Sequence, residues 1–410
     1  MTQVVLENAR IFDGIHGECP QGMQVLVEDG LIREVSSGSL RTDKAQIIDV
    51  GGRTLMPGLI DGHIHACASD VDPDRVLKHG EAYRTAFAAR MLGHALKCGF
   101  TTVRDVGGGS YSLSRAISDG LIQSPRYYYA GRFLSMSGGH GDFRQPHEDG
   151  EACSCGTLTS LGRIANGVDE VIHAAREELR CGAHCIKIMA SGGVASPTDP
   201  IWMNQYRDDE IRAVVQETLE RRTYTAAHCH PPSSIRRCAE LGVRSIEHGT
   251  LIDDETAQFV AGTPAYIVPT MVIIFALVEL GRSLGFPAAS QQKVQEVFRN
   301  ALTGMDCMRR AGVRIGFGTD LLGKLYTQQC REFTLRREVF TPLEILQQAT
   351  SVTAELMMMQ GRIGCIAPNA YADLLVVDGD PLEDIGLLAA DGVNLSLIMR
   401  GGELVKNELV

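Results

Sequence analysis

The stretch Met56-Pro-Gly-Leu-Ile-Asp-Gly-His-Ile-His65 decides how the rest of the chain is interpreted. It is a short apolar run, punctuated by glycines, that ends in two histidines separated by one residue. Residues i and i+2 of a strand point to the same face, so His63 and His65 can converge on one metal ion about 2 Å away. The spacing is a weak signal by itself, because an isolated His-X-His pair is usually two surface or core histidines.

Outward from this stretch, strand and helix patterns alternate along the chain. Eight apolar runs are expected to be strands: 59–63, 101–105, 127–131, 185–189, 224–228, 243–248, 266–269 and 313–320. Helical patterns lie between most of them: 74–98, 112–119, 168–181, 208–222, 233–241, 253–261 and 291–311, with another over 343–349. Eight strands alternating with helices over about 300 residues favour an α/β fold, a (β/α)8 TIM barrel. A doubly wound open sheet is the alternative that periodicity leaves open.

Strand-rich segments flank this region at both ends. Runs over 4–8, 23–28, 31–35 and 45–50 are typical of short strands, and Glu28-Asp29-Gly30 is a hairpin signal. The last 50 residues contain similar runs over 373–378 and 395–400. We therefore expect the two termini to pair into one small sheet domain.

Composition limits the function classes. The chain is 44% hydrophobic and 22% charged, which is ordinary for a globular protein and excludes disordered and fibrous architectures. The net charge of −11, without a basic run, argues against nucleic-acid and membrane partners. The chain does not start with a secretory signal, and its most apolar region, 265–280, is too short to span a bilayer. We predict a cytoplasmic location.

Twelve cysteines are scattered along the chain without a Cys-X-X-Cys pair. Most are expected to be free thiols. A structural zinc at Cys153 and Cys155 would need two further ligands from elsewhere.

Polar residues follow the predicted strands where a barrel places its active site, at the carboxyl ends. They are Lys187, His228, His248 and Asp320, in addition to His63 and His65. A lysine inside an apolar strand is costly unless it is paired or neutralised. Each of these residues alone has an ordinary explanation, such as a core histidine or a helix cap, but all six occupy the same relative position.

This set of six residues resembles the metal signature of the amidohydrolase superfamily, and the resemblance covers nearly the whole chain. It implies a barrel over 57–360 and a β-sandwich formed by both termini, 1–56 and 361–410. It also implies that His63, His65 and Asp320 bind one zinc and that His228 and His248 bind a second. Lys187 would be carboxylated and, together with a hydroxide, would bridge the two ions.

Shorter motifs point to one branch of the superfamily. Segments 137–142, 187–193, 196–200 and 245–249 are similar to metal-dependent dipeptidases that cleave Xaa-Pro or Xaa-Arg/Lys bonds. The same branch includes ochratoxin-hydrolysing amidases and N-acyl amino acid hydrolases. The resemblance thus implies a binuclear zinc hydrolase that cleaves the amide bond of a dipeptide or N-acyl amino acid through a metal-bridged hydroxide.

Catalytic roles follow from the same resemblance. Asp320 would pass a proton from the hydroxide to the leaving nitrogen, and His140 would steady the carbonyl oxygen. A hydrolase or deaminase of a cyclic amide, similar to imidazolonepropionase, is the alternative on the same scaffold, although such enzymes often lack the bridging lysine. A third possibility is a barrel that has lost its metals and serves as an assembly protein. In such a protein some of the ligand residues are expected to be missing.

Substrate binding is the least determined part. His230 stands where relatives often carry a Tyr that helps hold the substrate carboxylate. Arg207 and Arg237 are candidate carboxylate clamps, and Trp202 is a candidate for lining the pocket. We expect specificity to reside in the long loops 138–155 and 191–206. The expected partner is a small amide or dipeptide, and we expect a homo-oligomer, with 266–280 as a candidate subunit interface.

Overall fold

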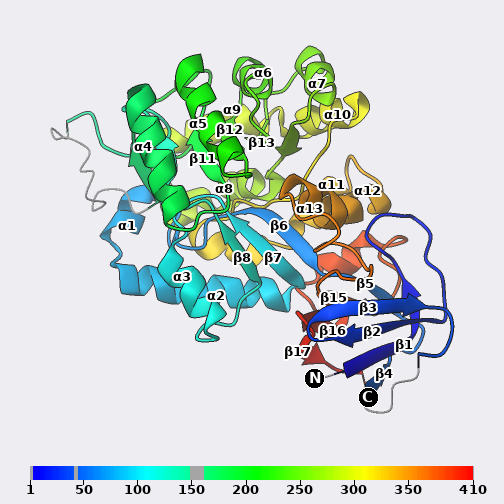
Figure 1. Ribbon diagram of the computed structural model, residues 1–410. Helices are drawn as coiled ribbons and strands as arrows, with labels where there is room; N and C mark the ends of the chain where they lie inside the picture. Colours follow the sequence, from blue (N-terminus) through cyan, green and yellow to red (C-terminus); the bar gives the residue numbers. More distant parts are fainter. Residues whose placement is uncertain (1–2, 41–44, 148–160, 410) are drawn as a thin grey trace.

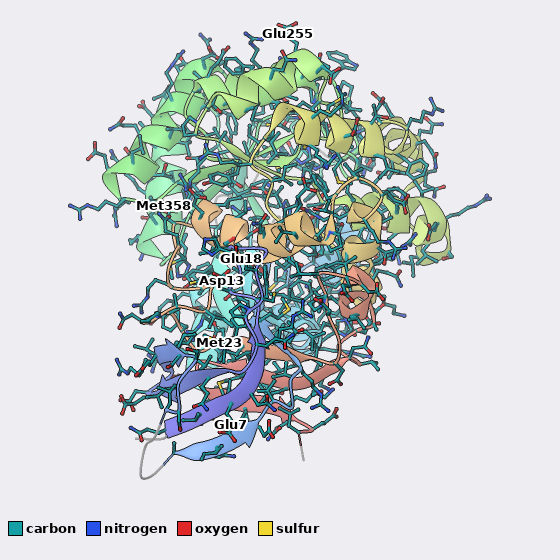
Figure 2. All side chains as sticks on the ribbon, turned by 90° about the vertical axis from the view of Figure 1, so that its right-hand side faces the viewer. Glu7, Asp13, Glu18, Met23, Glu255 and Met358 are labelled. Atoms are coloured by element: carbon teal, nitrogen blue, oxygen red, sulfur yellow. The ribbon has the colours of Figure 1, made fainter. Side chains whose placement is uncertain are left out.

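The computed structural model describes residues 3–40, 45–147 and 161–409. It is an α/β structure in which parallel sheets and their covering helices form one end of the molecule and an eight-stranded sheet forms the other (Figure 1). Figure 2 shows the same division, with Glu7 and Met23 on the terminal sheet and Glu255 at the opposite end. Cys153 and Cys155, the pair considered for a structural zinc, lie outside the described residues.

Two parallel sheets carry the strand ends on which the site is built. The first has the order β6 (Leu59–Ile64), β7 (Phe100–Asp105) and β8 (Arg126–Tyr129). The second has the order β10 (Gly162–Ile164), β9 (Phe133–Ser135), β11 (Ile186–Met189), β12 (Thr225–Cys229), β13 (Ser245–His248) and β14 (Tyr266–Val268). Most residues of these strands are buried, as expected for parallel strands covered by helices.

Helices follow most of these strands. They are α1 (Pro73–Lys78), α2 (Glu81–Lys97), α3 (Tyr111–Ser118), α4 (Gly167–Arg180), α5 (Asp208–Glu220), α6 (Pro232–Glu240), α7 (Asp254–Ala261), α8 (Met271–Leu284), α9 (Ala288–Phe298), α10 (Ala301–Ala311), α11 (Arg331–Arg336), α12 (Pro342–Gln347) and α13 (Thr353–Leu356). Over the described ranges, none of the helices has the length and apolarity needed to cross a membrane.

The predicted strand over 313–320 is wrong as a regular strand. This segment makes a single bridge, from Ile315 to Ile267 of β14, and then turns to β6, where Gly62 N donates to Phe317 O at 2.8 Å. Close approach explains the irregularity. A Cβ on Gly318 would lie 2.5 Å from Val268 and 2.7 Å from His63, and Phe317 N is taken by the Thr353 hydroxyl rather than by a neighbouring strand.

Two predicted helices are interrupted, and α8, α11 and α13 were not predicted. The helix expected over 74–98 breaks at Gly80, which caps α2 with extended backbone. The helix expected over 291–311 divides into α9 and α10 around Asn300. The apolar segment 266–280 forms β14 and most of α8, because its apolar residues pack against the core of the parallel sheets.

The terminal sheet combines strands from both ends of the chain. Its order is β17 (Glu403–Asn407), β16 (Leu395–Arg400), β15 (Leu374–Val377), β5 (Thr54–Pro57), β1 (Gln3–Ile11), β2 (Met23–Glu28) and β3 (Leu31–Ser36), with β4 (Gln46–Asp49) paired to β1. Strands β5 and β17 were not predicted. Asp29 and Gly30 both have positive φ, as a tight hairpin turn requires, and the predicted hairpin between β2 and β3 is confirmed.

Candidate metal centre and active site

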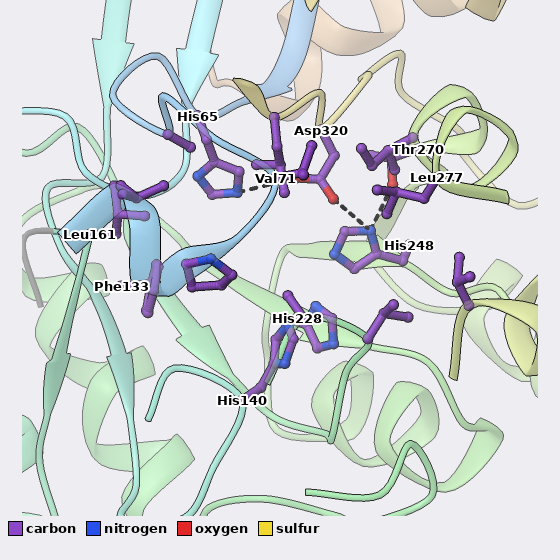
Figure 3. Close-up of a pocket in the computed structure, with 18 of the residues that line it drawn as sticks. His65, Val71, Phe133, His140, Leu161, His228, His248, Thr270, Leu277 and Asp320 are labelled. Carbon is purple, nitrogen blue, oxygen red and sulfur yellow. Dashed lines mark hydrogen bonds and ion pairs between the residues drawn. The ribbon is translucent and has the colours of Figure 1, made fainter. Parts of the chain in front are cut away.

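The predicted metal ligands come together at the carboxyl ends of the strands (Figure 3). Asp320 Oδ1 lies 3.3 Å from His63 Nε2 and 3.2 Å from His65 Nε2. The ring of His248 lies 5.0 Å from that of His63 and 4.6 Å from that of His228, between centroids. Lys187 is 1% exposed and lines the same pocket. Five of the six residues thus line one cavity, and His63 lies beside them in contact with Asp320.

Strand periodicity explains why these side chains face inward. On β11, Lys187 alternates with Ile186 and Ile188, which pack into the surrounding apolar core. At β13 the alternation breaks, because consecutive residues Glu247 and His248 both contact the site. His248 has φ +71°, a left-handed conformation that is uncommon for a residue other than glycine and that reverses the side-chain direction. Asp320 also has a left-handed backbone conformation, with φ +56°.

Hydrogen bonds orient the imidazoles for metal binding. His63 Nδ1 donates to Glu247 Oε2 at 2.7 Å, and His65 Nδ1 donates to Gly107 O at 3.0 Å. A neutral imidazole that donates from Nδ1 keeps its lone pair on Nε2, and these are the two nitrogens that face Asp320. His228 donates from Nε2 to Gly192 O at 3.2 Å, which leaves its lone pair on Nδ1.

These atoms fit a divalent ion. His63 Nε2 is buried and has no hydrogen-bond partner, although a buried polar nitrogen normally has one. Its 3.3 Å distance to Asp320 Oδ1 is close to the separation of about 3.4 Å between nitrogen and oxygen ligands of a tetrahedral zinc. The ligand atoms of His63, His65 and Asp320 all lie within 4.8 Å of one another.

A buried ion pair supports the first histidine. Glu247 accepts from Arg104 Nη2 at 2.9 and 3.1 Å, and both side chains are fully buried. Ser245 Oγ donates to the same carboxylate at 2.5 Å. Burial alone would raise the pKa of Glu247, but the Arg104 charge and the His63 hydrogen bond hold it well below its usual range. Glu247 therefore stays ionised and fixes His63 in one tautomer.

Burial and charge shift the protonation equilibria of the site. Desolvation holds the pKa of His228 and of His248 well below the usual range, and the neighbouring histidines add to the effect on each. Desolvation also lowers the pKa of Lys187, although the negative charges of Glu247 and Asp320 act to raise it. Burial would raise the pKa of Asp320, but the nearby histidines hold it well below its usual range. His228 and His248 are thus neutral and Asp320 is ionised.

His140 is held by a network on the loop that follows β11. His140 Nδ1 lies 2.7 Å from Ser196 Oγ, and Ser196 Oγ donates to Asp199. His140 N donates to Gln205 Oε1 at 2.9 Å. Lys293 Nζ of α9 donates to Ser196 O at 2.8 Å and to Gly193 O at 3.1 Å, so α9 ties the loop in place.

His140 and His230 both face the metal ligands. The His140 ring stacks on that of His228 at 4.2 Å, and the His230 ring stacks on that of His248 at 5.2 Å, between centroids. His230 Nδ1 lies 3.0 Å from Thr250 Oγ1. Desolvation lowers the pKa of His140 to about 4 and that of His230 to about 3.

The cavity is mostly apolar, and its empty space of about 910 Å³ includes space that is open to solvent. Apolar side chains from several elements line it: Val71, Val76, Phe133, Phe143, Leu161, Met189, Val194, Ile273, Ile274, Leu277, Phe286, Val294 and Leu322. Besides the histidines, the only basic side chain among the described lining residues is Lys187. A bulky apolar group therefore fits better beside the metal ligands than a charged one.

Three residues predicted to bind substrate lie elsewhere. Arg207 caps α5, and its side chain is 83% exposed and pairs with Asp209. Trp202 is 71% exposed and does not line the pocket. Arg237 Nη2 donates to Gln205 O at 3.0 Å and thereby supports the loop. The expectation of carboxylate clamps and a pocket-lining Trp is corrected for all three, because Arg207 and Trp202 are directed outward and Arg237 is engaged by the loop backbone and Asp208.

Sequence reasoning missed the residues that support the ligands. Glu247 and Arg104 carry a partial signal, since each is a charged residue within a predicted strand. Thr270, whose Oγ1 lies 2.7 Å from His248 Nδ1, follows a predicted strand directly. Lys293 shows no signal in the sequence, because it lies on a helix far along the chain from the loop that it binds.

Comparison with known proteins agrees with this site. Residues 54–405 match the model of the amidohydrolase family. The chain belongs to this family. It is 32% identical over 367 residues to an ochratoxinase of Aspergillus niger, covering 86% of this chain and 75% of that protein. The prediction of a hydrolytic enzyme acting on amide bonds is confirmed at the level of the family.

Solved structures show the same relationship. The crystal structure of an amidohydrolase is 46% identical, with a TM-score of 0.97 and 100% of both chains covered. A prolidase complexed with N-methylphosphonate-L-proline is 42% identical, with a TM-score of 0.97, 99% of this chain and 100% of that chain covered. The predicted resemblance to the prolidase-like and ochratoxinase branch is confirmed.

Proposed function

We propose that this enzyme cleaves the amide bond of a dipeptide or N-acyl amino acid, as an Xaa-Pro dipeptidase does, and prefers a large apolar group on the acyl side. The observation that carries the proposal is that the predicted metal ligands face a pocket lined mostly by apolar side chains. The prolidase and ochratoxinase relatives support this type of substrate.

Two zinc ions are part of the proposal. His63, His65 and Asp320 would hold one ion, His228 and His248 the other, and carboxylated Lys187 would contact both. The lowered pKa of Lys187 supports carboxylation, because the neutral amine attacks the carbon of carbon dioxide and loses a proton. When bound, such ions make water nucleophilic at neutral pH and polarise the amide carbonyl.

Asp320 is the proposed proton carrier. Its carboxylate lies 3.2 Å from His65 Nε2 and 3.9 Å from His248 Nδ1, at the centre of the ligand set. Because it is ionised, Asp320 can take a proton from the attacking water. It then delivers that proton to the amide nitrogen, which becomes a better leaving group when protonated.

His140 is proposed to face the scissile carbonyl. Because Ser196 donates to Asp199, Ser196 Oγ accepts from His140 Nδ1, and neutral His140 presents Nε2 as an acceptor. Stabilising negative charge on the carbonyl oxygen requires His140 to gain a proton at Nε2. Asp199 Oδ2, 3.7 Å from His140 Nδ1, would stabilise the resulting cation. We therefore expect His140 to be neutral before substrate binds.

His230 is proposed to contact the substrate carboxylate. Apart from Lys187, no lysine or arginine is found among the described lining residues, so a carboxylate would meet neutral donors. Apolar residues of α8, such as Ile273 and Leu277, and Phe286 after it, form the wall that would accept the acyl side chain. We expect discrimination to come more from apolar burial than from an ion pair.

A substrate panel with metal analysis tests the function. Leu-Pro, Phe-Pro, Gly-Pro, Leu-Arg and N-acetyl-Phe would be compared, with imidazolonepropionate as the cyclic amide, using zinc-loaded and chelated enzyme. We expect zinc-dependent release of the C-terminal amino acid, with the apolar dipeptides at least tenfold better than Gly-Pro in kcat/KM. Turnover of the cyclic amide alone would assign the alternative function, and unchanged turnover after chelation would contradict the metal mechanism.

We also propose the finer architecture. Backbone hydrogen bonds from His184 N to Tyr129 O, from Gly316 N to Ile267 O and from Asp320 N to His63 O support a ring of strands, and thus a closed barrel over 57–360. The terminal sheet would be a β-sandwich built from 1–56 and 361–410. A cytoplasmic location and a homo-oligomer are parts of the same proposal.

A further inference from the structure

A second group of metal-binding side chains lies at the carboxyl end of α2, outside the apolar pocket. His94 and Cys98 stand one helical turn apart, and Asp391 lies in the turn after a short 3-10 helix, η3 (Ile385–Ala389). One ligand atom from each residue lies within 4.8 Å of the other two. Over the described ranges, the only other group with this property is His63, His65 and Asp320.

The distances in this group suit a tetrahedral ion. His94 Nε2 lies 3.5 Å from Cys98 Sγ. A zinc ion bound at about 2.05 Å by nitrogen and about 2.3 Å by sulfur separates the two ligand atoms by about 3.6 Å. Residues four apart on a helix lie on the same face, so α2 presents both donors in one direction.

Backbone packing places Asp391 opposite this face. Asp391 and Gly392 have φ of +48° and +77° and form a left-handed turn. A Cβ on Gly392 would lie 2.1 Å from Lys97 O, so the turn is packed directly on the end of α2. Lys406 Nζ donates to Gly392 O at 3.3 Å from the other side. The exposed Asp391 side chain is therefore held near Cys98 by its backbone.

A fourth donor lies beside the other three. Cys330, fully buried before α11, is a further thiol beside this group, since the neighbouring Cys98, burial and Asp391 all raise its pKa. Two thiols, one imidazole and one carboxylate form a donor set typical of zinc, and softer than the all-nitrogen-and-oxygen set of the catalytic pocket. The four residues come from α2, the start of α11 and the C-terminal segment.

We propose that His94, Cys98, Cys330 and Asp391 form a second zinc site, which fastens the C-terminal segment to α2 and α11. The three segments are separated by more than 50 residues of chain from one another, so an ion shared among them would restrain their relative positions. The role would be structural, because Cys330 would complete four protein donors around a tetrahedral ion.

Cobalt substitution tests the site independently of hydrolysis. Metal-free protein would be reloaded with Co²⁺, and a thiolate-to-cobalt charge-transfer band would be measured in the near ultraviolet. We expect the band in the original protein, in the control Cys181→Ser, which removes an exposed cysteine outside the group, and in His63→Asn, which removes a proposed catalytic ligand. We expect its loss in Cys98→Ser, with one zinc fewer per chain.

Asp391→Asn provides a second variant at an exposed position, where unfolding is not expected. It should weaken zinc retention against a chelator at least tenfold and keep the far-ultraviolet circular dichroism of the original protein. A missing charge-transfer band in folded, cobalt-loaded protein would overturn the proposal. A Cys98–Cys330 disulfide in zinc-loaded protein, detected by peptide mass mapping, would overturn it as well. Hydrolysis of the substrate panel reports separately on the catalytic pocket.

Discussion

The buried pair Arg104–Glu247 offers a quantitative test of how the first metal ligand is held. Glu247 receives two contacts from Arg104 at 2.9 and 3.1 Å and one from His63 at 2.7 Å, and both members of the pair are fully buried. Breaking a buried pair by removing one partner leaves an uncompensated charge, at a cost of about 3–5 kcal/mol. Replacing both partners removes the charge as well as the attraction.

We therefore predict strong coupling in a double-mutant cycle. Arg104→Met and Glu247→Gln should each lower the free energy of unfolding of metal-free protein by about 3–5 kcal/mol. The double variant should be more stable than the sum of the two effects predicts, with a coupling energy of about 2–3 kcal/mol. Glu247→Gln should also weaken zinc affinity about 10–100-fold, because a neutral amide makes His63 a weaker base.

Urea unfolding monitored by circular dichroism gives the free energies, and competition with a chromophoric chelator gives the zinc affinity. The matched control is the exposed pair Arg176–Glu217, which has similar geometry at 2.7 and 2.9 Å. Arg176→Met should leave the urea midpoint nearly unchanged because solvent screens that pair. Additive effects in the cycle, or an unchanged midpoint for Glu247→Gln, would refute the reasoning.

Three further predictions concern the pocket. Gly193→Ala would place a Cβ 2.2–2.4 Å from the His140 ring, so kcat should fall at least tenfold. The control Gly80→Ala, whose Cβ would meet nothing within 4 Å, should keep the original rate. Equal rates for the two variants in a steady-state assay would contradict the assigned position of His140. Burial lowers the pKa of His230 to about 3, so the folded protein binds fewer protons than the unfolded chain below pH 6.5. Metal-free protein should therefore lose about 2 kcal/mol of stability from this residue between pH 6.5 and pH 5, and urea titrations of His230→Gln should show a total loss smaller by about that amount. Lys187→Ala should lower bound zinc below that of the original enzyme and reduce kcat by about 10³ or more, with partial recovery on adding a short-chain carboxylate; full activity without the lysine would exclude its role.

The sequence by itself determined the strand ends and the residues that they carry. Lys187 is a cation in an apolar strand, and His63 and His65 follow the two-residue period of a strand. Because parallel strands of an α/β fold end at the same edge, local periodicity was enough to predict that these side chains converge. Most helix boundaries were also set by local sequence. The predicted helices over 74–98 and 291–311 were wrong only at Gly80 and Asn300, where a turn interrupts a continuous apolar pattern.

Only the tertiary structure decided which groups support the ligands and what the pocket accepts. Arg104 of β7 donates to Glu247 of β13, and Lys293 donates to Gly193, which lies 100 positions earlier in the chain. Asp391 of the C-terminal segment lies close to Cys98 at the end of α2. Arg207, which the sequence offered as a candidate carboxylate clamp, is directed into solvent by its position at the start of α5. Such contacts join residues far apart in the chain and depend on packing direction and backbone approach, which leave no periodic pattern in the sequence.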